Sequence, residues 1–228
     1  MEACVDTLFR FTLLVLLGLA LSGCSIVSLR TGQIQGSGNI TTETRDVGAF
    51  TVIDVAGVGE VVITQGDTNS LTVETDDNLH AIVLGDVRDD TLYLGIKANQ
   101  GFSDATRITF TVTVKELTAI SFSGAGTVSV RDLSGEQLTV NHSGAGRVTV
   151  AGTVGEQRVT LSGAGNYDGA ALASERAMVE LSGFGSVVVN VSERLDATVS
   201  GAGSIAYIGS PELHEQVSGL GSIQQRAP

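Results

Sequence analysis

The segment ISFSGAGTVSV, residues 120–130, places two glycines inside a run that otherwise alternates as a β-strand does. Near copies of this segment follow along the chain, and each contains the motif Ser-Gly-x-Gly. The six copies begin at Ser123, Ser143, Ser162, Ser182, Ser200 and Ser218, at intervals of 20, 19, 20, 18 and 18 residues. A fixed short period indicates a repeat architecture, in which each copy packs on the next one.

Apolar residues recur at equivalent positions of the copies. One position before the serine stand Phe122, His142, Leu161, Leu181, Val199 and Val217. Three positions before it stand Ile120, Val140, Val159, Val179, Ala197 and Glu215. Two positions after the second glycine stand Val128, Val148, Tyr167, Val187, Ile205 and Ile223. Because side chains of a strand alternate between its two faces, these columns predict an inward face and a solvent face.

The repeat predicts an all-β protein, specifically a parallel β-helix with about 18–20 residues per coil over residues 117–225. The glycines are expected at the corners of the coils, where φ > 0 or a close backbone approach excludes a Cβ. The serines of successive corners are expected to stack and to bond between rungs. The corner residues are Ser123, Gly124, Gly126, Ser143, Gly144, Gly146, Ser162, Gly163, Gly165, Ser182, Gly183, Gly185, Ser200, Gly201, Gly203, Ser218, Gly219 and Gly221.

An irregular β portion is expected to precede the repeats. Short alternating runs at FTVIDVAGVGEVVITQGD, LTVETD, TLYLGIK and RITFTVTV predict strands between turns. The AGVG that begins at Ala56 resembles a degenerate first copy of the motif, and Asp89-Asp90 is placed as the turn of a hairpin. After Ile223 the last copy turns polar, which predicts an end cap against edge-to-edge growth.

The N-terminus has the features of an export signal. The apolar run FTLLVLLGLALSGC, residues 11–24, is too short to span a bilayer and ends in a sequence that resembles a bacterial lipobox. We therefore expect a signal peptide at 1–23, a lipidated Cys24 with a tether at 24–47, and a single β-helical domain at 48–228. Ser25 after the cysteine favours the outer membrane by resemblance to diderm lipoproteins, on either its surface or its periplasmic side.

Composition excludes several classes of partner. The formal charge of −12 disfavours nucleic acid and anionic lipid headgroups. The two cysteines are Cys4, which would leave with the signal peptide, and Cys24. The mature chain would then hold no thiol for a disulfide, and its stability would come from packing and backbone ladders.

The order of these segments resembles a known family. GQIQGSGNITTETRDVGAFTVIDVAGVGEVVITQGD, then VETDDNLHAIV with VRDDTLYLGIK, and finally the SGAG coils are similar to the bacterial head GIN domain family of adhesin-like proteins. That family has long been treated as a domain of unknown function. The resemblance covers residues ~32–225 and implies a β-helical, exported or lipid-anchored protein. It brings no catalytic residues to this chain.

The sequence offers little for catalysis or metal binding. His80, His142 and His214 fall at unrelated phases, without a second His or Cys at metal-ligand spacing. His142 interrupts an apolar column and is expected to be packed, whereas His214 is expected to be solvated in a connecting segment. Repeated calcium binding is disfavoured because Asp168 is the single carboxylate near the position that would need one in every coil.

The remaining charged residues suggest no catalytic group. The pairs Asp76-Asp77 and Asp89-Asp90 are expected in solvated turns, and the motif serines have no nearby histidine base. The arginines at positions 147, 158, 176 and 194 are expected at different phases of the coil, not as one cluster. We expect no catalytic, metal or cofactor site, which disfavours a polysaccharide-degrading enzyme.

These features favour a non-enzymatic envelope lipoprotein that presents a rigid β-helical surface, as an adhesin that binds glycans or surface polymers. The alternative is a periplasm-facing scaffold or assembly factor that binds another envelope protein. The expected partners are the membrane, through Cys24, and a glycan or an envelope protein. The sequence does not indicate the oligomeric state.

Overall fold

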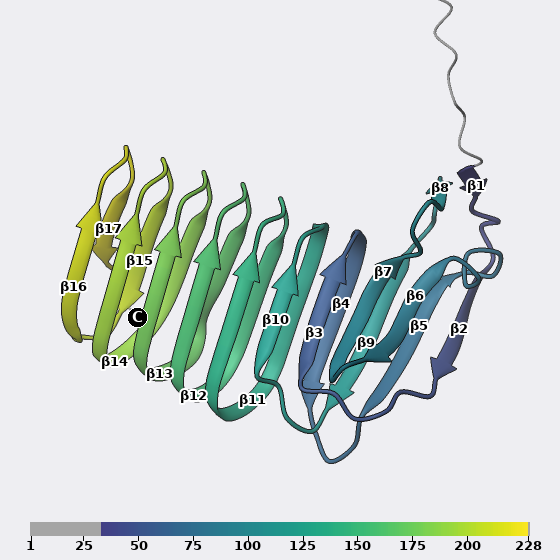
Figure 1. The fold of residues 1–228 in the computed structure, drawn as a ribbon, viewed down its shortest axis with the longest axis horizontal. Helices are drawn as coiled ribbons and strands as arrows, with labels where there is room; N and C mark the ends of the chain where they lie inside the picture. Colours follow the sequence, from purple (N-terminus) through teal and green to yellow (C-terminus); the bar gives the residue numbers. More distant parts are fainter. Residues whose placement is uncertain (1–32, 228) are drawn as a thin grey trace, which may run out of the picture. The chain divides into compact units, whose positions relative to one another are not determined.

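The computed structural model describes residues 33–227, so the predicted signal peptide and Cys24 lie outside the described residues. Over this range the chain is all β, as predicted, and it contains no helix. Accordingly, residues 33–227 provide no helix with the length and apolarity needed to cross a bilayer. Most strands belong to one large mixed sheet that is not closed (Figure 1).

The N-terminal strands combine parallel and antiparallel pairing. Their bounds are β1 Gln33–Gln35, β2 Ile40–Arg45, β3 Val52–Ala56, β4 Val58–Gln65, β5 Ser70–Asp76, β6 Val83–Arg88, β7 Thr91–Ile96, β8 Gly101–Ser103 and β9 Ile108–Val114. Strands β1 and β8 form a small parallel sheet, while β5 lies antiparallel between β2 and β9. The antiparallel hairpin β6–β7 turns at Asp89 and Asp90, with φ of 46° and 62°, which confirms the predicted turn.

Two of these strands lie where a tether was expected. The predicted tether ran to residue 47, but β1 and β2 occupy residues 33–35 and 40–45 within it. Strand β2 pairs with β5 over six residues. The polar, glycine-containing composition of this stretch suits an exposed edge strand as well as it suits a loop, because β2 has one paired neighbour and one free side.

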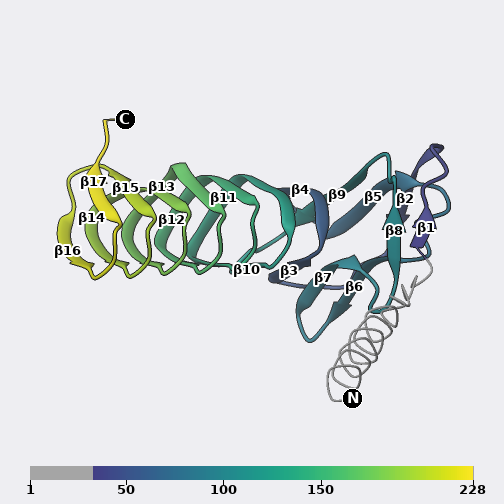
Figure 2. The same cartoon turned by 90° about the horizontal axis from the view of Figure 1, so that it is seen from above.

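The repeat region forms the rest of the sheet. Its strands are β10 Ala119–Phe122, β11 Ala125–His142, β12 Arg147–Leu161, β13 Asn166–Leu181, β14 Ser186–Val199, β15 Ser204–Ile208, β16 Glu212–Val217 and β17 Ser222–Gln225. Each copy pairs in parallel with the next one, and the register follows the sequence columns. The inner column pairs Ile120 with Val140, then runs through Val159, Val179, Ala197 and Glu215. Figure 2 shows the successive copies side by side.

The degenerate motif at Ala56 continues this register. Ile53 pairs with Ile120 on one side of the corner, and Gly59 pairs with Gly126 on the other. The first rung is therefore formed by β3 and β4, although residues 66–118 separate them from the second rung in sequence. Within that insertion, β7 pairs with β3 and β9 pairs with β4, so the N-terminal strands cover the first rung.

The predicted inward columns form a large part of the core, which also includes apolar residues of the N-terminal strands. In the first five copies their members are at most 2% exposed, from Phe122 at 2% to Ile120 and Leu161 at 0%. In the last copy Val217 is 46% exposed and Glu215 is exposed, because β16 and β17 have neighbours on one side of the stack. Burial of these aliphatic columns, at roughly 25 cal/mol per Å² of apolar area, is the main stabilising contribution.

One polar network lies inside the core. The Tyr167 hydroxyl donates to Gln157 Oε1 at 3.1 Å, and Gln157 Nε2 donates to Ser174 Oγ at 2.7 Å. Ser174 Oγ in turn donates to the carbonyl oxygen of Asn190 at 2.9 Å. Burial, with a further contribution from the charge of Asp168, raises the pKa of the Tyr167 hydroxyl, which therefore stays protonated as a donor. The network joins consecutive rungs and fixes their register.

Candidate functional site: the Ser-Gly-x-Gly edge

The motif glycines are required by close backbone approach. A Cβ on the first glycine of a copy would overlap the carbonyl oxygen of the first glycine one rung before, as at Gly144 over Gly124 and Gly183 over Gly163. The ladder continues through the corner, since Ala145 N donates to Gly124 O at 3.1 Å. Of the two explanations that the sequence allowed, positive φ applies to Gly57 and Gly59 of the first rung, and close approach applies to the six copies.

The second glycine makes room for the inner column. A Cβ on Gly165 would overlap the ring of His142, and one on Gly203 would lie 2.7 Å from Leu181 Cδ2. The residue before each serine thus packs beneath the second glycine of the following copy. The pair of glycines is therefore a packing requirement that is repeated at every rung.

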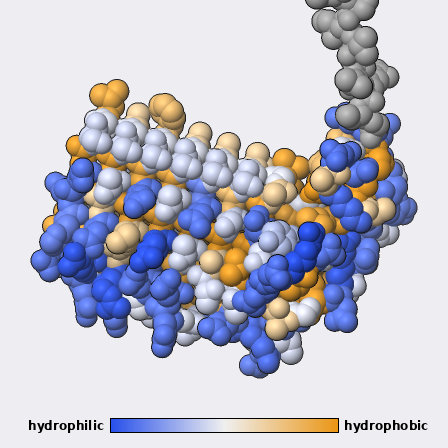
Figure 3. Space-filling model, viewed as in Figure 1, coloured by the Kyte–Doolittle hydropathy of each residue, from blue (hydrophilic) through white to orange (hydrophobic). Residues whose placement is uncertain are grey.

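The residue between the two glycines points outward in every rung. These residues form a row that we call the apolar ridge: Val58, Ala125, Ala145, Ala164, Phe184, Ala202 and Leu220. Phe184 is 80% exposed and Leu220 is 93% exposed. Figure 3 shows the ridge as a line of apolar side chains along the upper edge, above a pale band of motif residues.

The expected bonding between stacked serines is not what the structure shows. Among the six motif serines, within residues 33–227, Ser123 alone donates its hydroxyl to the preceding rung, to Val55 O at 3.4 Å. Most of the motif serines are exposed, so water competes for their hydroxyls and a bond along the stack gains little. Five hydroxyls along this edge consequently have no partner among the described residues.

A second row of polar side chains follows the ridge. It stands one position after the second glycine and consists of Thr127, Arg147, Asn166, Ser186, Ser204 and Ser222, paired in register. We call the sheet surface that carries this row the hydroxyl face. A groove of ≈ 360 Å³ separates its last four members from Phe184 and Leu220, and no charged residue lines that groove.

His142 is packed in the core, as the sequence predicted. It is 1% exposed and its ring stacks on that of Phe122 at a centroid distance of 4.9 Å. Neither ring nitrogen has a hydrogen-bond partner among the described residues. Burial lowers the pKa of His142, so the ring is neutral at pH 7.

Asp76 corrects the expectation of a solvated turn. The side chain is 0% exposed and accepts hydrogen bonds from Thr106 N at 2.8 Å, Gly38 N at 2.6 Å and Thr106 Oγ1 at 3.0 Å. These donors, led by the backbone N–H of Thr106, hold the pKa of Asp76 below its usual range. Asp77 is exposed and accepts from Ser37 Oγ at 2.6 Å and Asn39 Nδ2 at 2.9 Å. The pair therefore clamps residues 37–39 onto the domain.

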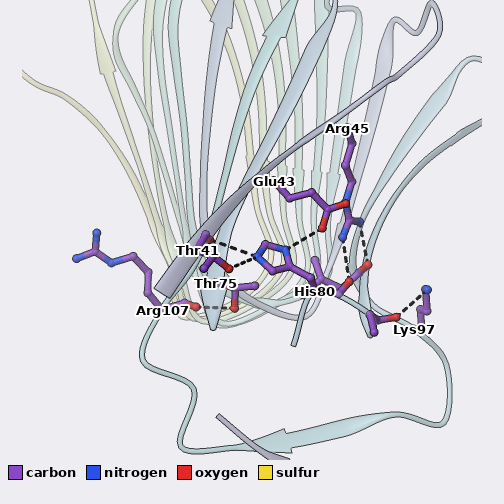
Figure 4. Close-up of polar contacts among 9 residues, drawn as sticks. Thr41, Glu43, Arg45, Thr75, His80, Lys97 and Arg107 are labelled. Carbon is purple, nitrogen blue, oxygen red and sulfur yellow. Dashed lines mark hydrogen bonds and ion pairs between the residues drawn. The ribbon is translucent and has the colours of Figure 1, made fainter. Parts of the chain in front are cut away.

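A second cluster holds strand β2 at the edge of the sheet (Figure 4). His80 Nε2 lies 3.0 Å from Thr41 Oγ1, and His80 Nδ1 lies 3.2 Å from Glu43 Oε2. The order hydroxyl, imidazole and carboxylate is that of a hydrolase triad. However, Nε2 also lies 3.3 Å from Thr41 O, and Arg45 donates to Val83 O at 2.9 Å and to His80 O at 3.0 Å. These contacts fasten β2 to the loop before β6, and we assign them that structural role.

The coil arginines are closer together than expected. Arg176 and Arg194 pair in one register column, so the prediction of different phases was wrong for this pair. Each arginine stands six positions before the serine of its motif, Ser182 or Ser200, so the register that aligns the motifs also aligns the arginines. Arg176 lies 3.8 Å from Glu156, which also pairs with Arg158 at 3.0 Å. Arg158, Arg176 and Arg194 each have a carboxylate partner on a solvated surface, whereas Arg147 has none within residues 33–227 and stands alone in its row.

His214 lies in β16 and not in a connecting segment, although it is solvated as expected. Its Nε2 lies 3.1 Å from Glu212 Oε1. Across the part of the chain that the structure describes, no three His, Cys, Asp or Glu side chains converge as metal ligands would. The feature with repeated polar groups is therefore the Ser-Gly-x-Gly edge with its hydroxyl face, where Ser186 Oγ donates to Asn166 Oδ1 at 2.6 Å and the hydroxyls of the motif serines from Ser143 onward have no partner among residues 33–227.

Comparisons with known proteins agree with this geometry. Residues 49–211 match the model of the family described as "Putative auto-transporter adhesin, head GIN domain". A "putative adhesin" from Bacteroides fragilis NCTC 9343 is 28% identical with a TM-score of 0.72, and the match covers 85% of this chain and 100% of that chain. No curated protein matches the chain.

Two further solved structures share the fold at lower identity. A "putative adhesin" from Parabacteroides merdae ATCC 43184 is 21% identical with a TM-score of 0.56, covering 85% of this chain and 99% of that chain. A "putative lipid binding protein" from Parabacteroides distasonis ATCC 8503 is 20% identical with a TM-score of 0.52, again covering 85% and 99%.

Proposed function

Because the chain belongs to the head GIN domain family of auto-transporter adhesin-like proteins, we propose that it is a non-enzymatic adhesin of the bacterial cell envelope. The family and the similar solved structures carry the names of adhesins and of a lipid-binding protein, not of enzymes. The observation that carries the proposal is the hydroxyl face, where small polar side chains repeat in register from one rung to the next.

The scaffold in this proposal is a parallel β-helix with about 18–20 residues per coil over residues 117–225. In-register parallel pairing of successive copies supports it. Such a scaffold keeps equivalent side chains ~4.8 Å apart along the stack. An extended polymer can then make many weak, evenly spaced contacts, which add up to useful avidity.

The ligand in this proposal is an extended, uncharged glycan. The groove beside the hydroxyl face offers Asn166, Ser186 and Ser204 as hydrogen-bonding groups, and Phe184 and Leu220 as an apolar wall. Hydroxyl and amide groups with an apolar surface suit sugar rings, which are polar at their edges and apolar on their faces. The formal charge of −12 would repel acidic polymers.

Titration of the full chain with neutral and acidic cell-wall polysaccharides tests this function. Ser204→Glu places a carboxylate in the hydroxyl face and should weaken binding of a neutral glycan by about tenfold. Thr198→Glu is the matched control, since Thr198 faces away from the core on the strand before the same corner and should bind as the parent does. Equal loss in both variants, or a flat response to every polymer, contradicts glycan binding on this face.

The anchor in this proposal is a lipidated Cys24 that follows a signal peptide at 1–23. The domain at 48–228 would then be tethered to the outer membrane by a segment whose second part is β1 and β2. Cys24→Ser should release the protein into the soluble fraction, because one lipid-bearing residue provides the membrane attachment. Mass spectrometry of the purified chain for N-terminal acyl groups tests the same point directly.

The alternative is a periplasm-facing scaffold that binds another envelope protein. The exposed apolar ridge favours it, because exposed apolar patches mark protein as well as membrane contacts. Protease treatment of intact and of permeabilised cells separates the two functions. Digestion on intact cells would place the domain at the surface and support adhesion, whereas protection until permeabilisation would support the scaffold.

A further inference from the structure

The apolar ridge concentrates exposed apolar area. Within residues 33–227, six large hydrophobic side chains are notably exposed, and three of them, Val58 at 46%, Phe184 at 80% and Leu220 at 93%, stand in this one row. The two most exposed, Phe184 and Leu220, are two rungs apart, or roughly 10 Å at the spacing of neighbouring strands. Between them lies Ala202, so both larger side chains project beyond their neighbours.

The ridge is also free of charge. The chain has 13 basic and 25 acidic residues, yet none of them falls within the six Ser-Gly-x-Gly copies. An apolar environment at this edge would therefore desolvate no ionised group of the motif. The same environment along most other outward columns would bury carboxylates or arginines.

The backbone at the ridge is already bonded. Phe184 N donates to Gly163 O at 3.1 Å and Leu220 N donates to Gly201 O at 3.0 Å. Unbonded peptide groups are the main obstacle to placing irregular backbone in contact with lipid, and the ladder removes that obstacle for these donors. An ordinary loop would expose unbonded peptide groups to the lipid, whereas the corners at Phe184 and Leu220 have bonded N–H groups and can lie in an apolar medium.

The start of the described chain lies on the same side as the ridge. In Figure 1, β1, which begins at Gln33, is at the upper edge, where the corners of the repeats also lie. Eight residues, 25–32, separate Gln33 from Cys24. A segment of that length spans at most about 28 Å when fully extended. An anchor at Cys24 would therefore hold this side of the domain near the membrane.

From these features we propose that the apolar ridge rests on the lipid bilayer that anchors the chain, with Phe184 and Leu220 inserted among the acyl chains of zwitterionic lipids. The orientation rests on the proposed anchor at Cys24, whereas the lipid contact rests on the ridge itself. The negative charge of the protein selects zwitterionic over anionic lipid. A second copy suits the ridge less well, because a row one side chain wide falls short of the area of a stable dimer.

In this arrangement Phe184 and Leu220 contact lipid and no longer serve as the groove wall for a glycan, which can still contact the rest of the hydroxyl face. Its columns run down the strands away from the corners, so the positions of Thr149, Asp168 and Ala206 lie further from the lipid than the ridge does. Contact with the membrane would then set the direction in which the stack presents its binding face. The inference thus adds a membrane-facing edge to the proposed adhesin.

Fluorophore labelling of the full chain tests the contact. A Cys4→Ser background receives one cysteine at position 184 or 220, is labelled with an environment-sensitive dye, and is reconstituted into phosphatidylcholine vesicles that contain nitroxide-labelled lipid. Met178→Cys is the matched control, because Met178 is also an exposed hydrophobic residue but faces outward from the strand before the corner. The background chain without an added cysteine reports any labelling of Cys24.

We expect strong quenching by the nitroxide lipid at positions 184 and 220 and little at 178. Replacing a third of the phosphatidylcholine by phosphatidylglycerol should reduce the quenching severalfold through charge repulsion. Equal quenching at all three positions, or quenching at 184 and 220 by aqueous iodide alone, overturns the inference. Protection of the dye from iodide without lipid quenching would indicate a second chain at the ridge and would overturn it as well.

The Cys24→Ser form separates this inference from the anchor. Lipid quenching at 184 and 220 that persists without Cys24 would support the ridge contact and remove the need for the anchor. An anchored chain whose ridge labels remain unquenched would retain the anchor and refute the ridge contact.

Discussion

The carbonyl oxygen of Gly144 occupies the space that a Cβ on Gly163 would need. Because the backbones of Gly144 and Gly163 both belong to the inter-rung ladder, neither backbone can move without breaking hydrogen bonds between rungs. Gly163→Val should therefore lower the free energy of unfolding by about 3 kcal/mol, measured by chemical denaturation. Gly135→Ala is the control, since a Cβ there meets nothing within 4 Å and should change stability by less than about 0.5 kcal/mol. Similar stabilities for the two variants would contradict the close-approach account.

The clamp at Asp76 predicts acid sensitivity. Its pKa is lowered by hydrogen bonds, so its contribution to stability is present above the unfolded-state value near 4 and is lost as the pH falls through the lower folded-state value. Asp76→Asn should lower the melting temperature at pH 7 and flatten its decrease below about pH 4. Asp89→Asn, in the exposed hairpin turn, should keep the parent profile. A parent melting temperature that is constant between about pH 5 and pH 2 would rule out this role for Asp76.

The unpartnered ring of His142 predicts a stabilising substitution. His142→Leu removes two buried nitrogens that lack hydrogen bonds and matches Leu161, which holds the same position in the next copy. The free energy of unfolding should rise by about 1–3 kcal/mol at pH 7. The lowered pKa of His142 means that the parent loses stability as the pH falls from about 6.5 through the folded-state value. The variant should lack that dependence, and a loss of stability in the His142→Leu variant would indicate that the ring has a partner.

The open end of the stack depends on Glu215. This residue stands in the column of Val179 and Ala197, so in the last rung a carboxylate occupies an inward position. Inward charges on a terminal strand oppose pairing with another chain. Glu215→Val should therefore produce concentration-dependent self-association in sedimentation velocity, whereas Glu193→Val, at a solvated position, should sediment as the parent does. A Glu215→Val variant that sediments as the parent does would refute the predicted function of this end as a cap.

Local periodicity was sufficient to predict the inward columns and the register of the repeats. Each member of an inward column stands one to three positions from its Ser-Gly-x-Gly motif. Because the motif repeats, its spacing also gives the spacing of the columns. The same local signal identified the first rung at Ala56, despite the insertion that follows it. The sequence alone could not decide between positive φ and close backbone approach as the reason for the glycines. The oxygen that excludes a Cβ on Gly163 belongs to Gly144, which is 19 residues away in sequence.

Contacts between distant segments could not be predicted in this way. Asp76 resembled a turn residue because its donors, Gly38 and Thr106, are 38 and 30 residues away. The contact of Thr41 with His80 spans 39 residues and belongs to a strand that has the composition of a loop. The shared column of Arg176 and Arg194, by contrast, was predictable from the repeat, because each arginine stands six positions before a motif serine.

The insertion between the first two rungs also has a consequence for the order of folding. Closing the chain from Gly126 to Gly146 joins residues 20 apart, whereas closing it from Gly59 to Gly126 joins residues 67 apart. The longer closure costs about 1 kcal/mol more in chain entropy. The C-terminal rungs should therefore nucleate the protein, and β3 and β4 should dock onto them afterwards. The N-terminal strands of the described chain, although synthesised before the repeats, would then be the last to become native.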